Sequence, residues 1–249
     1  MSLPILLSIP HAGLLIPKVV KDLCILNLED IIKDSDGRAS EIYHPLYKEV
    51  SAFVTTDVAR AIIDVNRAES DRRKDGVVKT HTCWNVPVYN EFPSGKLVEY
   101  LLEEYYRPYH RRLTLYAKDI LLGVDCHTMA ATGPPVGPDP DVERSYICIT
   151  NADSTCPTKW LSSLAASFEK IFETKVSINK PFKGGYIIRH HSQEIPWIQL
   201  ELSRAPFLSN EEKSSRVFDA LKSWFKNNSY LLKKKSYGRR GRIEKNPIK

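Results

Sequence analysis

Short apolar segments alternate with longer amphipathic stretches along most of this 249-residue chain. Segments of β-strand length and composition lie at residues 4–9, 52–56, 61–67, 120–125, 146–150, 175–179 and 197–202. Stretches with helical periodicity lie at residues 27–33, 39–50, 96–118, 157–172 and 211–225. Strands interleaved with helices predict an α/β fold in which helices cover both faces of a sheet.

Local signals refine three of these elements. Asn27 is a candidate cap for the helix that follows it. Pro108 is expected to kink or divide the helix at 96–118, because proline lacks the backbone N–H that a helix interior needs. Gly184 and Gly185 predict a turn that leads into a further extended segment ending at Arg189. They lack the spacing of a phosphate-binding loop.

Composition is ordinary for a globular protein, with 42% hydrophobic and 27% charged residues. No apolar run approaches the roughly 20 residues of a transmembrane helix, and the N-terminus lacks the basic region of a signal peptide. We therefore expect no membrane partner.

The net charge of +6 is a property of the C-terminus. Residues 233–249 hold eight lysines and arginines against one glutamate, which leaves residues 1–232 close to neutral. We expect residues 1–232 to form a single domain and residues 233–249 to form a disordered basic tail. The basic residues of the tail do not alternate with aromatic ones, since Tyr237 is its single aromatic residue, and it has no fold motif, so a nucleic-acid partner is not expected.

Cysteine usage indicates a reducing compartment. The five cysteines are odd in number and form no Cys-x-x-Cys pair; they are Cys24, Cys83, Cys126, Cys148 and Cys156. This pattern favours reduced thiols and a cytoplasmic location over a disulfide framework.

Polar residues that suit a metal site stand at the ends of two predicted strands. His11 follows residues 4–9, and Asp125 and His127 lie two positions apart, so on a strand they point to the same face. Two neutral imidazoles, one carboxylate and an open position form a catalytic zinc site. Asp34 and Asp36 are the carboxylates nearest in sequence to His11, and Asp125 is a candidate to orient His127.

Other polar residues have both a structural and a functional interpretation. Glu201, on the strand at 197–202, is either paired with Arg204 or another arginine, or is a general base that activates a water. Asn66, Arg67 and Arg189 end predicted extended segments, and an arginine fork suits a substrate carboxylate or a developing oxyanion. His110 falls within a helix, where core packing is the simpler interpretation. No Gly-x-Ser-x-Gly elbow and no cysteine nucleophile motif is present.

Several short motifs occur in one order along residues 5–208, and together they resemble the N-formylglutamate amidohydrolase family. They are Ser-Ile-Pro-His-Ala-Gly at 8–13, Asp-Ser-Asp at 34–36, Ile-Asp-Val-Asn-Arg at 63–67, Arg-Pro-Tyr-His at 107–110, Val-Asp-Cys-His at 124–127, the stretch 179–189 around Gly184 and Gly185, and Gln-Leu-Glu-Leu at 199–202. That family is similar to zinc carboxypeptidases and to aspartoacylase-type deacylases. The resemblance implies a phosphorylase/hydrolase-like, three-layer α/β/α fold with a mixed central sheet.

The resemblance also implies roles for individual residues. His11, Asp36 and His127 would bind the metal, and Asp36 is preferred to Asp34 because a glycine and then helical spacing follow it, as in related sequences. Glu201 corresponds to the catalytic glutamate, and Arg189, from its own position after the two glycines, is expected to assist it. Residues 64–67 correspond to the segment that grips a substrate carboxylate, through Asn66 and Arg67. Asp34, Asp125 and His110 would surround the metal ligands.

The chain departs from its relatives at several of these motifs. The relatives carry His-x-x-Glu, whereas Leu14 stands three positions after His11. Gly37 replaces a usual bulky residue, Thr128 stands where serine is common, and the proline-rich segment 132–140 is long. These departures bear on the shape of the substrate pocket.

The predicted activity is a zinc-dependent hydrolysis of the amide bond of a small N-acyl amino acid. N-formyl-L-glutamate, which would yield formate and glutamate, is the preferred substrate, and another divalent metal is the alternative to Zn²⁺. One rival hypothesis is a related amidase or carboxypeptidase-like hydrolase of another N-acyl or peptide substrate. A second is a binding protein that keeps the fold without turnover.

Overall fold

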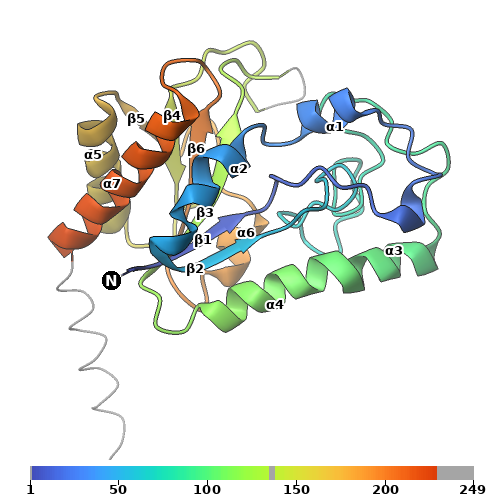
Figure 1. The fold of residues 1–249 in the computed structure, drawn as a ribbon, viewed down its shortest axis with the longest axis horizontal. Coiled ribbons are helices and arrows are strands. Elements are labelled where there is room, and N and C mark those ends of the chain that lie inside the picture. Colours follow the sequence, from blue (N-terminus) through green and yellow to red (C-terminus); the bar gives the residue numbers. More distant parts are fainter. Residues whose placement is uncertain (1, 135–137, 229–249) are drawn as a thin grey trace, which may run out of the picture.

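A six-stranded sheet forms the middle layer of the computed structural model, which describes residues 2–134 and 138–228 (Figure 1). Its strands are β1 (Leu3–Ile9), β2 (Val50–Thr55), β3 (Leu122–Met129), β4 (Ile147–Thr150), β5 (Val176–Ile178) and β6 (Trp197–Ser203). Their order is β2-β1-β3-β6-β4-β5, and every neighbouring pair is parallel except β4 and β6. The sheet is therefore mixed, as predicted.

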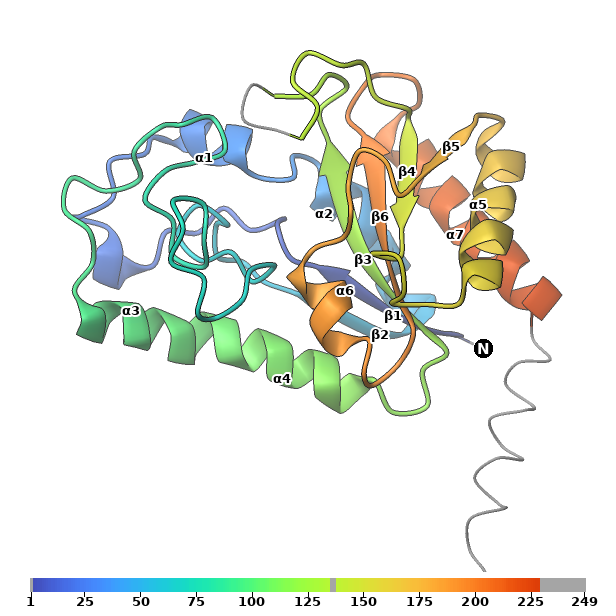
Figure 2. The same ribbon diagram turned by 180° about the vertical axis from the view of Figure 1, so that it is seen from behind.

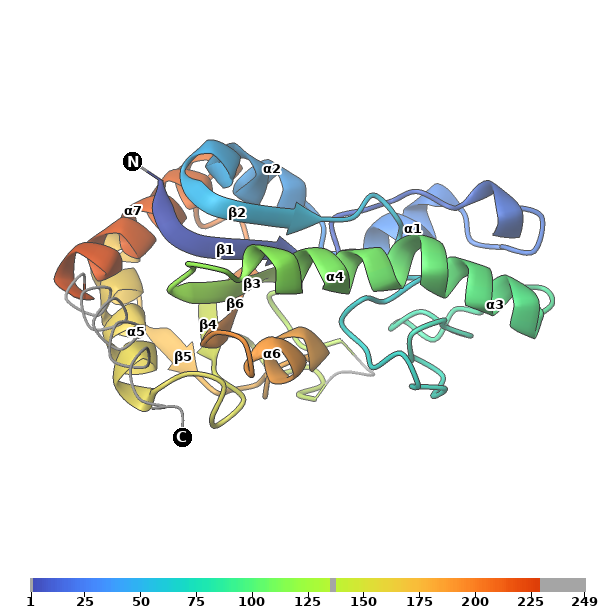
Figure 3. The ribbon, with the colours of Figure 1, turned by 90° about the horizontal axis from the view of Figure 1, so that it is seen from below.

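Helices cover both faces of this sheet. They are α1 (Leu28–Asp34), α2 (Ala39–Tyr43), α3 (Gly95–Leu101), α4 (Arg107–Tyr116), α5 (Thr158–Phe172), α6 (Tyr186–His191) and α7 (Asn210–Asn228), with 3₁₀ turns at Lys18–Val20 and His44–Lys48. The core of one face is formed with α2, α5 and α7, and that of the other with α4 and α6. Figure 2 shows α6 in front of the strands, and Figure 3 shows α2 and α6 on opposite sides of them. The predicted three-layer α/β/α arrangement is confirmed.

The two faces of the central strands differ in polarity. Ile5 and Leu7 of β1 pack toward α2 and α7, while Leu6 packs on the opposite side. On that opposite side the inward positions of β1, β3 and β6 also carry buried polar residues, namely Ser8, Asp125, His127, Gln199 and Glu201. Buried polar groups destabilise a core unless they are hydrogen-bonded, so this row of side chains marks a functional face of the sheet.

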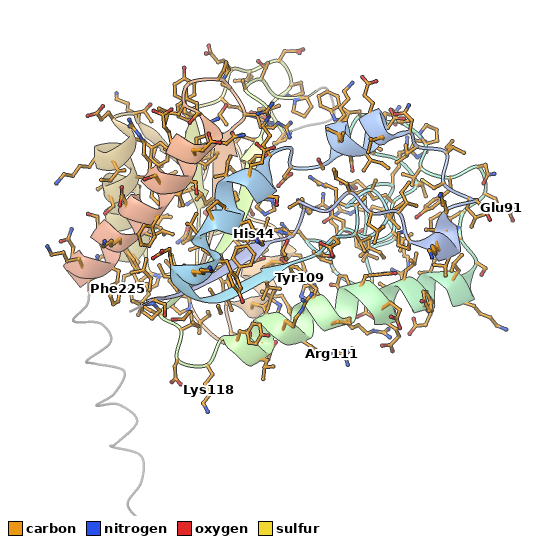
Figure 4. All side chains as sticks on the ribbon, viewed as in Figure 1. His44, Glu91, Tyr109, Arg111, Lys118 and Phe225 are labelled. Carbon is orange, nitrogen blue, oxygen red and sulfur yellow. The ribbon has the colours of Figure 1, made fainter. Side chains whose placement is uncertain are left out.

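The long helix predicted at 96–118 changes type along its length. A π-helical segment, Leu102–Tyr106, joins α3 to α4, and Figure 1 shows them as one rod. The wider turn stands directly before Pro108, whose ring would crowd a carbonyl of the preceding α-turn and which has no N–H to donate. The proline is therefore accommodated without dividing the helix. Figure 4 shows Tyr109 on the inner side of α4 and Arg111 on the outer side.

The predicted strand at 61–67 is wrong. These residues form successive turns, because the Asp64 carboxylate accepts a hydrogen bond from the backbone N–H of Asn66 at 3.0 Å and closes the chain locally. The extended segment predicted up to residue 189 is also wrong, since α6 begins at Tyr186 with Ile187 and Ile188 buried. Val50 opens β2 rather than ending a helix.

The remaining predictions on organisation have mixed outcomes. Asn27 caps α1, since its side chain accepts a hydrogen bond from the backbone N–H of Asp30 at 2.9 Å. All five cysteines lie within the described residues and are free. In the described part of the chain no helix combines the length and the apolar character needed to cross a membrane. The basic segment 233–249 lies outside the described residues.

Candidate active site

Two histidines and an aspartate from three separate segments meet at one edge of the sheet. His11 follows β1, Asp36 lies between α1 and α2, and His127 lies on β3; all three are buried. The Asp36 backbone N–H donates to the His11 carbonyl at 3.1 Å, which ties two of these segments together. Asp36 Oδ2 lies 2.8 Å from His127 Nδ1 and 3.5 Å from His11 Nδ1. One potential ligand atom from each residue lies within 4.8 Å of the others.

Each imidazole contacts a second carboxylate through the ring nitrogen that faces away from Asp36. His11 Nε2 lies 2.8 Å from Asp64 Oδ1, and His127 Nε2 lies 2.8 Å from Asp125 Oδ2. Since an ionised carboxylate only accepts, each Nε2 carries a proton, so Nδ1 is the nitrogen through which each ring, once neutral, would bind a metal beside Asp36. This is the arrangement in which carboxylates orient metal-binding histidines.

The residues present fit a divalent metal. His11 Nδ1 is buried and has no hydrogen-bond partner, so a nitrogen lone pair faces Asp36 without a donor to satisfy it. Two nitrogens and one carboxylate oxygen are a donor set that zinc accepts, with a position left open. Burial opposes charge on both His127 and Asp36. Asp125 and Glu201 nevertheless raise the pKa of His127 well above its usual value, and the two histidines hold the pKa of Asp36 well below its own.

Two cations that the sequence interpretation missed, one partly and one fully buried, hold the aspartates in place. Arg60 donates to Asp36 Oδ1 and to Asp64 Oδ2, each at 3.3 Å. Lys79, which is fully buried, pairs with Asp34 at 3.3 Å and lies 3.5 Å from Asp64. Arg60 interrupts the apolar run 58–63, and Lys79 directly follows Val77 and Val78; a cation beside apolar residues is the signal that could have revealed both. The structure therefore places Asp34 in this ion-pair network, whereas Asp36 faces the imidazoles.

Strand register brings Glu201 beside the two-histidine site. β3 and β6 pair so that Glu201 is opposite His127 and Gln199 is opposite Asp125. Burial raises the pKa of Glu201 to about 7, with the positive charge of His127 opposing that rise. Its carboxylate accepts a hydrogen bond from Gln199 Nε2 at 2.7 Å, and the described residues hold no ion pair between Glu201 and Arg204. A buried carboxylate with this pKa can take and return a proton near neutral pH.

Two side-chain amides connect this edge of the sheet to the start of α6. Gln199 Oε1 accepts from the Gly185 N–H at 2.7 Å, and Asn66 Oδ1 accepts from the Ile187 N–H at 2.9 Å. These bonds fix which end of each amide is the oxygen. The NH₂ of Gln199 is thereby directed to Glu201, and the NH₂ of Asn66 to Asp125 at 3.3 Å.

Gly185 permits the close approach of α6 to Asn66. A Cβ atom at position 185 would lie 2.3 Å from Asn66 Nδ2. We expect Gly185→Ala to lower the free energy of unfolding by about 1–3 kcal/mol, because the Asn66 amide or the backbone must shift. Urea denaturation of both proteins measures this change.

Gly95→Ala is the matched control. A Cβ at Gly95, the first residue of α3, meets nothing within 4 Å. We expect this variant to be as stable as the unmodified protein, or more stable by about 0.4–1 kcal/mol. Equal stability of the two alanine variants would contradict the proposed packing at Gly185.

The residues expected to grip a substrate carboxylate differ in their placement. Asn66 is buried and both ends of its amide are bonded to protein groups. Arg67 lines the cavity, but its guanidinium binds the side chain and carbonyl of Asp75. Arg189 is exposed and donates to the Lys183 carbonyl, and it does not line the cavity. The helical course of α6 turns residue 189 outward, so the expectation that Arg189 reaches the site is not met.

His110 supports the site from farther away than expected. Its Nε2 donates to the Val65 carbonyl at 3.0 Å, and its Nδ1 lies 2.9 Å from His191 Nε2. Burial and the neighbouring His191 lower the pKa of His110 to about 3, so the ring is neutral at physiological pH. His110 therefore holds the backbone beside Asn66 and has no hydrogen bond to His11, Asp36 or His127.

A cavity of about 460 Å³ opens onto these groups. His11, Asp36, His127 and Glu201 line it together, with Trp84 and Phe182 also in its wall. This volume is ample for a small acylated amino acid. The site can therefore combine a metal, a general base and a pocket for an organic substrate.

Comparison with known proteins identifies the family. The family model described as N-formylglutamate amidohydrolase matches residues 3–208, most of the chain. The chain belongs to the N-formylglutamate amidohydrolase family. The motifs that suggested this membership all lie within the matched range.

Relatives within the N-formylglutamate amidohydrolase family match over most of their length. An N-formylglutamate deformylase of Pseudomonas putida is 25% identical over 228 residues, covering 84% of each chain. One from Pseudomonas aeruginosa is 25% identical over 226 residues, covering 84% of this chain and 83% of the relative.

Solved structures share the fold of this family member. The crystal structure of an N-formylglutamate amidohydrolase from Ralstonia eutropha JMP134 has a TM-score of 0.72 and 17% identity, covering 96% of this chain and 95% of the other. A gene product of Agrobacterium tumefaciens has a TM-score of 0.73 and 15% identity, covering 91% and 92%. These likenesses establish the architecture that surrounds the site.

Proposed function

We propose that this protein is a metal-dependent hydrolase that cleaves N-formyl-L-glutamate to formate and glutamate. The observation that carries the proposal is the convergence of His11, Asp36 and His127 beside Glu201 in a chain of this family. The names of the Pseudomonas relatives support the choice of substrate.

His11 Nδ1, His127 Nδ1 and a carboxylate oxygen of Asp36 would hold the metal, which we propose is Zn²⁺. When bound, the cation supplies Lewis acidity, which polarises a carbonyl oxygen and lowers the pKa of a water. Asp64 and Asp125 keep the Nδ1 lone pairs of the two histidines directed at this position.

Glu201 is the proposed general base and acid. It takes a proton from the attacking water and returns it to the departing amine nitrogen, which requires a carboxylate that changes protonation state near neutral pH. Gln199 fixes the orientation of the Glu201 carboxylate throughout. Arg67 lines the cavity wall, where its guanidinium is paired with Asp75.

The proposal extends to the domain organisation and the cellular location of the protein. We propose a small-molecule substrate, a single domain over residues 1–232 and a cytoplasmic location. The buried polar row crosses β1, β3 and β6 of one sheet, which favours a single folding unit, and the free thiols favour a reducing compartment.

The direct test combines metal analysis with an assay of formate release. Purified protein is expected to contain close to one zinc per chain and to release formate from N-formyl-L-glutamate. Chelation should abolish release, and added Zn²⁺ should restore it. Protein that holds metal but releases formate from no N-formyl amino acid would overturn the proposed activity.

Gln199 offers a test of how Glu201 is positioned. We expect Gln199→Met, which keeps the length of the side chain and removes its amide, to lower kcat about 10- to 100-fold with a smaller change in KM. The reason is that Glu201 loses its 2.7 Å hydrogen bond while the cavity keeps its volume. Steady-state kinetics with thermal unfolding as a control measures this, and an unchanged kcat would contradict the positioning role.

A further inference from the structure

Most arginines in the cavity wall already have a carboxylate partner within the protein. Among the residues that the structure describes, four arginines line the wall. Three of them bind aspartates: Arg60 pairs with Asp36 and Asp64, Arg67 with Asp75, and Arg144 with Asp139. Their charge is neutralised before any substrate arrives, so they are poorly suited to bind a further anion strongly.

Arg204 is the one arginine of the wall that has no carboxylate partner among the described residues. It stands just past β6, three positions after Glu201, and is half-buried. Its Nη1 donates to the Ser35 carbonyl at 3.0 Å, and no carboxylate of the described chain pairs with it. A guanidinium has five N–H donors, so most of those of Arg204 remain available at the cavity wall.

The position of Arg204 relates it directly to the proposed metal site. Ser35 and Gly37 flank Asp36, and the Arg204 side chain lies against both. A Cβ at Gly37 would lie 3.6 Å from Arg204 Cδ, which is an ordinary van der Waals distance, so the arginine side chain runs alongside the Asp36 segment. Arg204 is therefore placed between that segment and the strand that carries Glu201.

We propose that Arg204 binds a carboxylate of the substrate and determines the preference for a dicarboxylate. This inference rests on the proposed function, since it assigns the residue that recognises the substrate of that reaction. The other unpaired cations of the wall are lysines that are exposed, such as Lys33 and Lys183. A half-buried guanidinium is more weakly hydrated than an ammonium group and matches a carboxylate with two parallel hydrogen bonds.

The test measures binding of two probes that differ in one charge. Glutarate carries two carboxylates and has no N-acyl amide to cleave. Its half-amide carries a single carboxylate. By titration calorimetry the metal-loaded protein should bind glutarate about 10- to 100-fold more tightly than the half-amide. Arg204→Met should bind the two probes alike. If Arg204→Met keeps the preference, or the unmodified protein shows none, the proposal is overturned.

A conservative variant and a matched control separate a loss of substrate recognition from a loss of the folded state. Arg204→Lys keeps the charge and loses the planar fork, so it should retain part of the preference. Arg111→Met removes an exposed arginine on the outer side of α4 (Figure 4) and should retain all of it. A preference in Arg204→Lys equal to that of Arg204→Met would show that charge at this position has no part in recognition and would overturn the proposal.

Kinetics separates recognition from a purely structural role. In Arg204→Met the advantage in kcat/KM of N-formyl-L-glutamate over an analogue with one carboxylate amidated should fall about 10- to 100-fold, mainly through KM. The side-chain amide and the α-amide are both assayed, and loss of either advantage supports the proposal. A uniform fall in kcat with both advantages unchanged would overturn it. Absence of turnover in the unmodified protein would overturn the proposed function, and the glutarate measurement would still decide the role of Arg204.

Discussion

Glu201→Gln is expected to reduce formate release from N-formyl-L-glutamate by about 10²–10⁴-fold in kcat. The substitution keeps the size of the side chain and a carbonyl oxygen that can accept from Gln199 Nε2, so the local packing should survive. The amide cannot take a proton from water near neutral pH, and the proton transfer to the departing amine is lost with it. Steady-state assays of formate release measure the effect.

Two controls make this result specific to Glu201. Glu91→Gln makes the same chemical change at an exposed glutamate far from the sheet (Figure 4), and its activity should match that of the unmodified protein. Metal content should be the same in all three proteins, because Glu201 is not among the three candidate ligands. Activity of Glu201→Gln within a few-fold of normal would mean that another group moves the proton.

Replacing Asp36 should have an effect of comparable size through a different cause. We expect Asp36→Asn to lose the bound metal and to lower formate release by about 10³-fold or more, because the anionic member of the proposed ligand set is removed. Metal content after dialysis and competition with a chelator measure affinity independently of turnover.

Asp34→Asn provides the comparison that separates the two aspartates. The pKa of Asp34 is lowered, since Lys79 and Arg60 outweigh the effect of its burial, and its carboxylate also accepts from the Cys83 N–H at 2.7 Å. Its loss should destabilise the fold by about 1–3 kcal/mol while the metal stays bound. The reverse pattern, with metal lost from Asp34→Asn and kept by Asp36→Asn, would contradict the ligand set.

The sequence predicts the residues that lie on regular strands better than those that lie on turns. Asp125 and His127 are two apart on β3, as are Gln199 and Glu201 on β6, and the period of a strand is enough to place each pair on one face. The three-layer arrangement follows from the same alternation of strands and helices. His11 is found by its position after β1, because the carboxyl ends of parallel strands collect ligand-binding groups.

Arg60, Asp64 and Lys79 could not be placed in this way. They belong to residues 56–90, which form turns and isolated bridges, and their partners are decided by how that segment folds back on the sheet. The alternating pattern at 61–67 is typical of a strand. The hydrogen bond from the Asn66 backbone N–H to the Asp64 carboxylate stabilises a turn there instead of pairing with the sheet. Helix α6 has six residues, fewer than a helical period needs to be recognised, and tertiary contacts stabilise it.

The pairing of β3 with β6 has a consequence for how the site meets its substrate. A shift of one residue in this register would turn Leu200 and Leu202 toward the cavity and send Gln199 and Glu201 into the apolar layer beside α7, so only one alignment is compatible with a folded core. The dipoles and charges around the reacting groups are thus oriented when the chain folds. Little reorganisation is left for the moment of reaction, which is the condition under which fixed polar groups lower a barrier most effectively.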